Sequence, residues 1–328
     1  MADDPYAGLA EHGIHRISIP TPFAVGRVNL YLIDDEPLTL VDAGPNSGTS
    51  LDELDHALRA LGRSIPEIER VVITHQHIDH IGLVEIAARR SGAEVAALDR
   101  LVPFVEHYRE EAAAEDEYAG EVMLRHGIPE DVAQVLRSVS LAFRAWGSRA
   151  DVSNVLGDGE TLEFAGRSLE IHFRPGHSPT DTVFLDAERS LLVAGDHLLA
   201  HISSNPLISR PPGRRPLVEY IESLERTRAM DLALVLPGHG PPIEDHRSLI
   251  EDRLRLHRKR ADKIHALVAE RPRTAYEIAQ ALWGNIAVTQ AFLTLSEVLG
   301  HTDVLIRDGR IAEDDEGDGR VRFRALTA

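Results

Sequence analysis

The chain has 328 residues, of which 43% are hydrophobic, and its formal net charge at pH 7 is −18. This length allows one large domain or two, and the charge disfavours nucleic-acid partners because an acidic protein repels phosphate backbones. No apolar run approaches the length of a membrane span, and the acidic first residues do not resemble a secretory signal. The absence of cysteine excludes disulfides and thiolate ligands and fits a cytoplasmic protein.

The beginning of the chain predicts strands followed by a helix. Hydrophobic residues alternate with polar ones over residues 14–19, 28–33 and 38–41, which predicts three strands. A helix is predicted to begin at Ser50, because Ser50 and Glu53 have the spacing of a capping box.

The segment that organises the chain covers residues 71–80, Val-Val-Ile-Thr-His-Gln-His-Ile-Asp-His. Its first three residues are apolar and β-branched, which predicts a buried strand. Directly after that strand come His75, His77, Asp79 and His80. Imidazole and carboxylate are the ligands of Zn²⁺ and similar metals. The segment therefore predicts a metal site at the carboxyl end of a strand, where open sheets place their sites.

Residues 74–80 match the T-H-x-H-x-D-H signature of the metallo-β-lactamase-fold hydrolases, and the chain resembles that family over roughly residues 14–245. The family also has a His, an Asp and a second His further along, each at the end of a strand. Here these are His177 in Pro-Gly-His-Ser, Asp196 in Ala-Gly-Asp-His and His239 in Pro-Gly-His-Gly, in the same order. The resemblance implies an α/β (α+β) fold, the αββα sandwich of the family.

The resemblance also implies a centre with two divalent metal ions. By the family's pattern, His75, His77 and His177 hold the first ion, Asp79, His80 and His239 hold the second, and Asp196 bridges both. Two such ions share a water molecule and lower its pKa toward roughly 7, so that a bridging hydroxide is the nucleophile. Zn²⁺ is the preferred metal, with Fe or Mn as alternatives. The bridging Asp resembles the glyoxalase II, lactonase and phosphodiesterase branches and not the strict β-lactamases.

Further polar residues are candidates for roles beside the metal ligands. Asp42, in Asp-Ala-Gly after the third strand, is interpreted either as support for the ligand segment, as in the family, or as a turn-forming residue. His201 is a candidate substrate contact or proton donor, with a surface histidine as the alternative. The candidate catalytic residues are therefore Asp79, Asp196 and His201.

Residues 101–147 have helical periodicity and almost no strand pattern, which predicts a helical insertion. In similar family members such an insertion covers the metal site; packing at a sheet edge, away from the chemistry, is the alternative. Its apolar residues Val132, Val139, Phe143 and Trp146 are predicted to share one helix face that suits an acyl chain. Strands are predicted again between residues 155 and 236.

Residues 246–328 predict a second unit after a catalytic domain of residues 1–245. Its predicted elements are helices at 247–270, 275–283 and 287–299 and strands at 303–311 and 320–326. This order is similar to the winged-helix-like C-terminal domain of the thioesterase and endoribonuclease-like branch of the family. Because the third helix has no Arg or Lys, we interpret the unit as a packing or dimer-forming module and not as a DNA reader.

Together these patterns predict a metal-dependent hydrolase of acyl thioesters or related esters. Phosphodiester cleavage, including endoribonuclease activity, is the main alternative. A lactonase and a non-catalytic ligand-binding scaffold are further alternatives. We expect a small-molecule substrate, no nucleic-acid or membrane partner, and a C-terminal unit that could join two copies of the chain.

Overall fold

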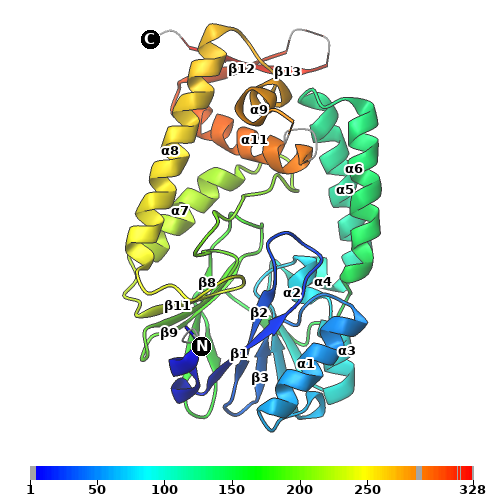
Figure 1. Ribbon diagram of the computed structural model, residues 1–328, viewed down its shortest axis with the longest axis vertical. Helices are drawn as coiled ribbons and strands as arrows, with labels where there is room; N and C mark the ends of the chain where they lie inside the picture. Colours follow the sequence, from blue (N-terminus) through cyan, green and yellow to red (C-terminus); the bar gives the residue numbers. More distant parts are fainter. Residues whose placement is uncertain (1–4, 286–289, 316, 318, 327–328) are drawn as a thin grey trace.

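The computed structural model of the protein describes residues 5–285, 290–315, 317 and 319–326 (Figure 1). Two β-sheets pack face to face between helices, which is the predicted αββα sandwich. Among the described residues, no helix is long and apolar enough to cross a membrane.

The first sheet contains six strands that follow one another in chain order. They are β1 (Ile14–Ile19), β2 (Val28–Ile33), β3 (Thr39–Val41), β4 (Arg70–Val72), β5 (Glu94–Leu98) and β6 (Asn154–Leu156). The first three are antiparallel, whereas β3 to β6 are parallel, with Val41 opposite Val72 and Val72 opposite Ala96. The parallel strands therefore end at one common edge of the sheet.

The second sheet has five strands in the order β11-β10-β9-β8-β7. They are β7 (Thr161–Glu163), β8 (Ser168–Phe173), β9 (Thr182–Asp186), β10 (Leu191–Gly195) and β11 (Leu234–Pro237). Only the pair β10 and β11 is parallel. The two sheets are connected where the backbone N–H of Asn29 in β2 donates to the carbonyl of Gly238, just after β11, at 2.6 Å.

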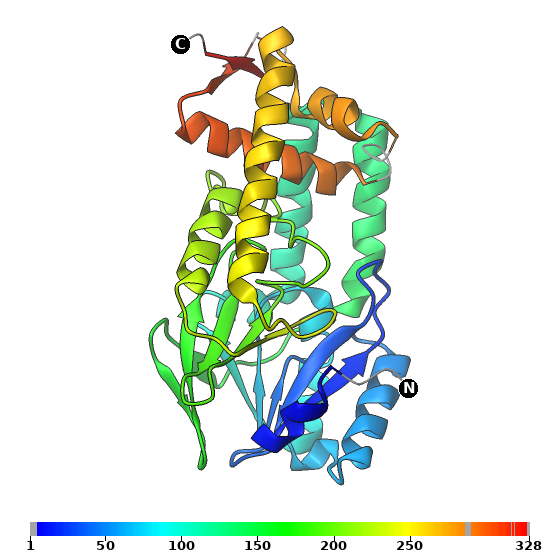
Figure 2. The same cartoon turned by 60° about the vertical axis from the view of Figure 1, so that its left-hand side comes forward.

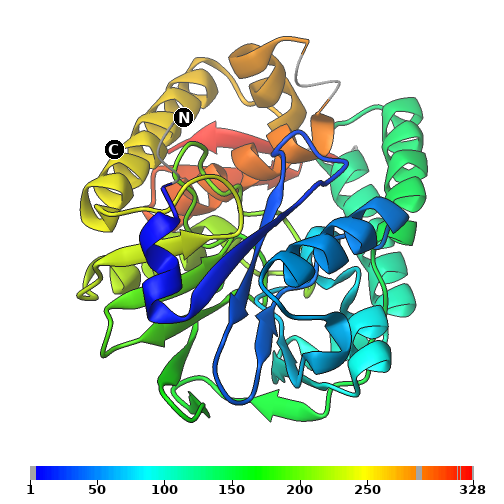
Figure 3. The ribbon, with the colours of Figure 1, turned by 60° about the horizontal axis from the view of Figure 1, so that its bottom comes forward.

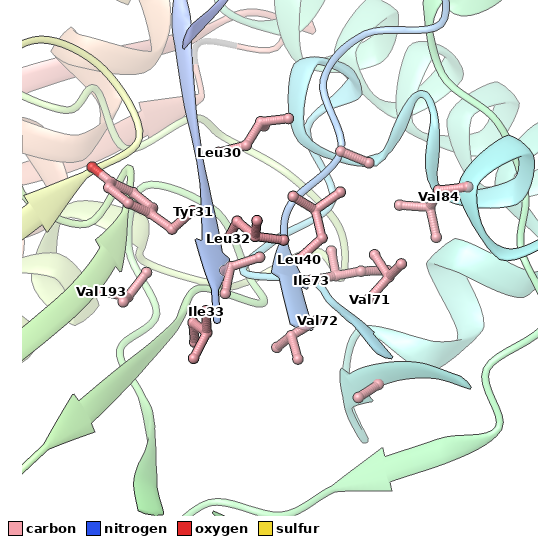
Figure 4. Packing of buried hydrophobic residues seen from close by; sticks show 14 of the residues in the cluster. Leu30, Tyr31, Leu32, Ile33, Leu40, Val71, Val72, Ile73, Val84 and Val193 are labelled. Atoms are coloured by element: carbon pink, nitrogen blue, oxygen red, sulfur yellow. The ribbon is translucent and has the colours of Figure 1, made fainter. Parts of the chain in front are cut away.

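The core lies on both faces of the first sheet, because side chains of a strand alternate between its two faces. In β2, Leu30 and Leu32 point to the side of Val84, whereas Tyr31 and Ile33 point toward the second sheet and Val193 (Figure 4). β2 is buried at every position. This double burial explains why residues 30–33 of β2 are apolar at consecutive positions, beyond the alternation expected of a strand that is buried on one face only.

Helices cover the outer face of each sheet (Figure 3). On the side of the first sheet these are α1 (Gly48–Ala60) and α3 (Val84–Ser91), and on the side of the second sheet α7 (Pro216–Arg228) and α8 (His246–Glu270). The N-cap of α1 is Ser47, whose hydroxyl accepts from the N–H of Ser50 at 3.0 Å. The predicted start at Ser50 is therefore wrong, because Ser47 lies one turn earlier and already satisfies that N–H.

The predicted insertion contains α4 (Val102–Glu106), α5 (Tyr108–Arg125) and α6 (Glu130–Phe143). The antiparallel pair α5 and α6 rises from the sandwich to the C-terminal elements (Figure 2). Val122 and Met123 at the far end of α5, and Ile128 just after it, share one hydrophobic cluster with buried residues of the C-terminal helices. The insertion and the C-terminal unit therefore have a common core.

The C-terminal elements are α8, α9 (Ala275–Trp283), α11 (Ala291–Arg307) and the hairpin of β12 (Ile311–Asp315) and β13 (Val321–Ala325). Thr274 caps α9 through a capping box with Glu277. The order of helices and hairpin is the predicted one, and its classification as a winged helix stays a prediction, as does a domain boundary at residue 245. The predicted helix start at Ala287 lies outside the described residues.

The predicted strand over residues 303–311 is wrong, because α11 continues to Arg307. The predicted helix ends at Leu299, but Gly300 lies inside the observed helix. A Cβ at Gly300 would lie 2.8 Å from the Cβ of Leu217 in α7, so the glycine allows close packing of two helices. The buried Val298 and Leu305 on either side continue the apolar face of α11.

Candidate metal centre

The predicted ligands come from four chain segments, each of which follows a strand. His75 and His77 follow β4, and Asp79 and His80 lie in α2 (Ile78–Ile81), the short helix that comes next. His177 follows β8, Asp196 directly follows β10, and His239 follows β11. The loops of both sheets thus bring these side chains to one edge of the sandwich.

The first group consists of three imidazoles whose nitrogen atoms converge. The Nδ1 atom of His77 lies 3.1 Å from Nε2 of His75 and 2.9 Å from Nε2 of His177. His75 is fully buried, and the other two are partly buried. These are the three residues predicted to hold the first ion.

The second group consists of Asp79, His80 and His239, whose potential ligand atoms lie within 4.8 Å of one another. The Nε2 atom of His239 is 3.3 Å from Oδ2 of Asp79. All three side chains are buried, with exposed fractions of 6% or less. These are the residues predicted to hold the second ion.

Asp196 lies between the two groups. Its Oδ1 atom is 3.6 Å from Nε2 of His80, and its Oδ2 atom is 3.6 Å from Nε2 of His177 and 3.5 Å from Nε2 of His239. Gly238 makes this approach possible, since a Cβ there would lie 2.3 Å from Oδ1 of Asp196. One carboxylate thus faces both groups, as the predicted bridge requires.

Hydrogen bonds on the far side of the rings fix how the second group is oriented. The Nδ1 atom of His80 lies 2.7 Å from Oδ2 of Asp42, and Nδ1 of His239 lies 2.9 Å from the carbonyl oxygen of Arg27. Asp42 also accepts from the N–H and the hydroxyl of Thr74 at 2.9 and 2.8 Å. A ring that donates through Nδ1 has its Nε2 lone pair free for a metal ion. Asp42 therefore supports the ligand segment.

The pKa values of the imidazoles in the cluster shift in different directions, because His80 and His239 face carboxylates whereas His75, His77 and His177 lie among other imidazoles. Burial lowers the pKa of His80, but the carboxylates of Asp42 and Asp196 outweigh burial and raise that pKa to about 10. Burial also raises the pKa of Asp79, but the imidazole of His239, with its Nε2 atom 3.3 Å from Oδ2 of Asp79, and the other nearby imidazoles hold that pKa below its usual value. Burial and the surrounding imidazoles keep the pKa of His75 well below the usual range.

Several buried polar atoms in the cluster have no hydrogen-bond partner among the described residues. They include Nε2 of His80, Nε2 of His239 and Oδ1 of Asp196. A buried polar atom without a partner costs about 1–3 kcal/mol, so such atoms call for an occupant. Imidazole lone pairs and carboxylate oxygens that converge in this way suit divalent metal ions. The residues present therefore fit the metal ions that the resemblance implies.

A cavity of about 580 Å³ opens onto this cluster, and His77, Asp79, His177, Asp196 and His239 form part of its wall. Much of the rest of the wall is apolar and comes from four further regions of the chain. These are the β1–β2 loop with Phe23, α5 and α6 with Phe143, the segment 199–209, and α11 with Phe292 and Leu293. Phe23 and Phe143 contact each other, with ring centroids 5.3 Å apart.

The cavity contains some predicted substrate contacts and lacks others. Phe143 lines it, but Val139 is 46% exposed and Val132 packs in the C-terminal core. The prediction that these residues form one apolar face toward the substrate is therefore wrong, because Val132 and Phe143 lie in different turns of α6 and face different neighbours. His201 is exposed and lies outside the described cavity wall, and its catalytic role stays a prediction.

Sequence reasoning did not find the aromatic and aliphatic residues that complete the cavity. Phe23, Phe292 and Leu293 have no motif around them, and each comes from an element distant in sequence from the metal ligands. The alternating pattern of β1 and β2 shows that a hairpin forms, but it does not show that the loop reaches α6.

Comparison with known proteins extends these observations. A sequence model of the Metallo-beta-lactamase superfamily matches residues 24–239. A protein of Bacillus subtilis named as the probable metallo-hydrolase YqjP is 32% identical over 316 residues, which cover 94% of this chain and 97% of that protein. A solved structure of a metallo-beta-lactamase family protein from Thermus thermophilus is 27% identical, with a TM-score of 0.81, and the match covers 96% of this chain and 99% of that one.

A more limited similarity links the chain to an atrochrysone carboxyl ACP thioesterase of Aspergillus fumigatus. It is 26% identical over 136 residues, which cover 42% of this chain and 40% of that protein. The family model and the full-length relative, together with the ligand geometry, agree on the same assignment. The chain belongs to the metallo-beta-lactamase superfamily.

Proposed function

We propose that the protein is a metal-dependent hydrolase of acyl thioesters or related small esters. The observation that carries this proposal is the apolar cavity that opens onto the cluster of histidines and aspartates. An apolar wall suits the hydrocarbon part of an acyl group, and the cluster lies where its carbonyl would be.

The residues of the cluster would hold two divalent ions, with Zn²⁺ as the preferred metal. His75, His77 and His177 would hold one ion, Asp79, His80 and His239 the other, and Asp196 would contact both. When bound, the ions would activate a water molecule and polarise the carbonyl that it attacks. Asp42 and the Arg27 carbonyl would keep the rings of His80 and His239 in place.

Charge in the cavity supports a thioester over a phosphodiester substrate. Among the described wall residues, Arg144 is the only Arg or Lys, and its guanidinium forms an ion pair with Asp116. A strand of RNA inside the cavity would need several unpaired cations for its phosphates, whereas a thioester has to place only its acyl part there. The overall charge of −18 acts against RNA as well. The partial similarity to a thioesterase supports the same choice.

The test is a comparison of substrates with the purified, metal-loaded protein. Acyl-CoA esters are assayed with a thiol reagent, which detects released CoA without background because the chain has no cysteine. Single-stranded RNA is assayed in parallel, and Asp196→Ala is the control for contaminating enzymes. We expect thiol release by the native chain and almost none by the variant. Cleavage of RNA without thioester hydrolysis would refute the proposal.

A further inference from the structure

Two of the regions that line the cavity come from different parts of the fold. The candidate metal ligands come from the sandwich, whereas α11 crosses above the sandwich edge, beneath the C-terminal hairpin (Figures 1 and 2). Phe292 and Leu293, in the first turn of α11, line the cavity from that side. An acyl group with its carbonyl at the ligands would therefore extend toward α11.

The first two turns of α11 are held in a defined position. The side-chain amide of Asn205 donates to the carbonyl of Leu293 at 3.1 Å, and the N–H of Ile208 donates to the hydroxyl of Ser296 at 3.3 Å. These bonds connect α11 to the segment 199–209, which forms another wall of the cavity. Phe292 packs against the C-terminal core. The part of α11 that lines the cavity is thus held by the segment 199–209 and by the C-terminal core.

Leu293 offers apolar surface that no other described residue covers. It is 43% exposed although it lies in a cavity wall among apolar neighbours such as Leu207 and Ile208. Covering such surface with hydrocarbon is favourable, and each buried methylene increases affinity about fourfold. Of the other charged wall residues, Asp116 and Arg144 form an ion pair, and Glu115 accepts from the backbone N–H of Arg210 at 3.2 Å.

We propose that α11 limits the length of the acyl chain that the cavity accepts, with Leu293 as the residue that sets this limit. The inference rests on the proposed thioesterase function. It assigns a role in substrate selection to a helix that lies beyond the residues 24–239 matched by the family model.

The test compares chain-length profiles of the native protein with those of two Leu293 variants. For straight-chain acyl-CoA esters from acetyl to palmitoyl, we expect kcat/KM of the native protein to rise about fourfold per methylene until the chain reaches α11. With Leu293→Trp, kcat/KM should stop rising at a shorter chain length, and each methylene that no longer fits should lower kcat/KM about fourfold relative to the native protein. Leu293→Ala should move it to longer chains.

Leu256→Ala is the matched control. Leu256 lies on α8, has a comparable exposed fraction of 51%, and is outside the cavity wall. Its substitution should leave the chain-length profile unchanged. Circular dichroism of each variant separates a change of specificity from a loss of fold.

The outcomes for the inference and for the proposed function are separable. Thioester hydrolysis with the same profile in the native protein and in both Leu293 variants overturns the inference and leaves the proposed function intact. Absence of hydrolysis with any thioester refutes the proposed function. In that case calorimetric binding of straight-chain carboxylates decides: a length limit that moves with residue 293 supports the inference, and equal affinities across the variants overturn it.

Discussion

The hydrogen bonds of Asp42 lead to a quantitative prediction for metal binding. Its carboxylate is 2% exposed and lies within 2.9 Å of three groups: Nδ1 of His80, and the N–H and the hydroxyl of Thr74. The informative change is Asp42→Asn, because Asp42 has φ of 59°, a left-handed conformation that Asn tolerates and most other residues do not. The amide keeps the volume but removes the charge and replaces one acceptor with a donor.

Loss of this support should weaken metal binding more than it weakens folding. Substitution of a residue that orients a metal ligand typically costs a factor of 10–100 in metal affinity, which is about 1.4–2.7 kcal/mol. Metal affinity is measured by competition with a chromophoric chelator, and stability by denaturant unfolding of the metal-free protein. We expect a drop in affinity of at least about tenfold in the variant.

Asp186→Asn is the matched control for this experiment. Asp186 is also 2% exposed and accepts from the guanidinium of Arg189 at 3.1 Å, but it lies in β9 and outside the ligand cluster. Its substitution should lower stability and leave metal affinity unchanged. Native metal affinity in a folded Asp42→Asn protein would refute the reasoning, and so would an equal loss of affinity in both variants.

Three further changes test how the ligand loops are assembled. Asp196→Ala removes the carboxylate that faces both groups and should abolish hydrolysis and lower the metal content per chain, measured by elemental analysis; native metal content would contradict the assignment. Gly238→Ala places a Cβ 2.3 Å from Oδ1 of Asp196 and should lower metal affinity, and an unchanged chelator titration would show that the loop can move aside. Tyr220→Phe removes the hydroxyl that donates to the carbonyl of His197 at 2.9 Å. This should lower the free energy of unfolding, measured with denaturant, by about 1–3 kcal/mol, and an unchanged value would contradict the expectation.

The candidate ligands could be predicted from sequence because each carries its own local signal. Where the sequence predicts a strand and a His or Asp follows it, both the type of the residue and its place at the end of the strand are known. Strands that run parallel bring such ends to one edge of the sheet. Asp42 could be predicted for the same reason, since it directly follows β3. The assignment of ligands to two groups came from the family resemblance and stays a prediction. Potential ligand atoms lie within 4.8 Å of one another in each of the two groups, and also among His75, His80 and Asp196.

The rest of the cavity could not be predicted, because its residues are identified only by contacts between distant segments. Phe23 and Phe143 meet across 120 positions of the chain, and nothing in either segment indicates the other. The predicted end of the third C-terminal helix falls just before Gly300, a residue type that often ends a helix, and only the neighbouring Leu217 explains why the helix continues. His201 had a plausible position after Asp196, but local position does not determine the direction of a side chain in a loop.

The shared core of the insertion and the C-terminal unit changes how the cavity should be understood. If α5 and α6 packed only on the sandwich, they could open as a lid without disturbing other elements. Instead Val122, Met123 and Ile128 are buried with residues of α8, α9 and α11 such as Ile264 and Val298, so separating α5 from α11 would expose this cluster to water. Burying each such side chain contributes about 1.5–3 kcal/mol, and three of them make separation costly. Opening of the cavity is therefore expected at the β1–β2 hairpin, while α5, α6 and α11 stay together.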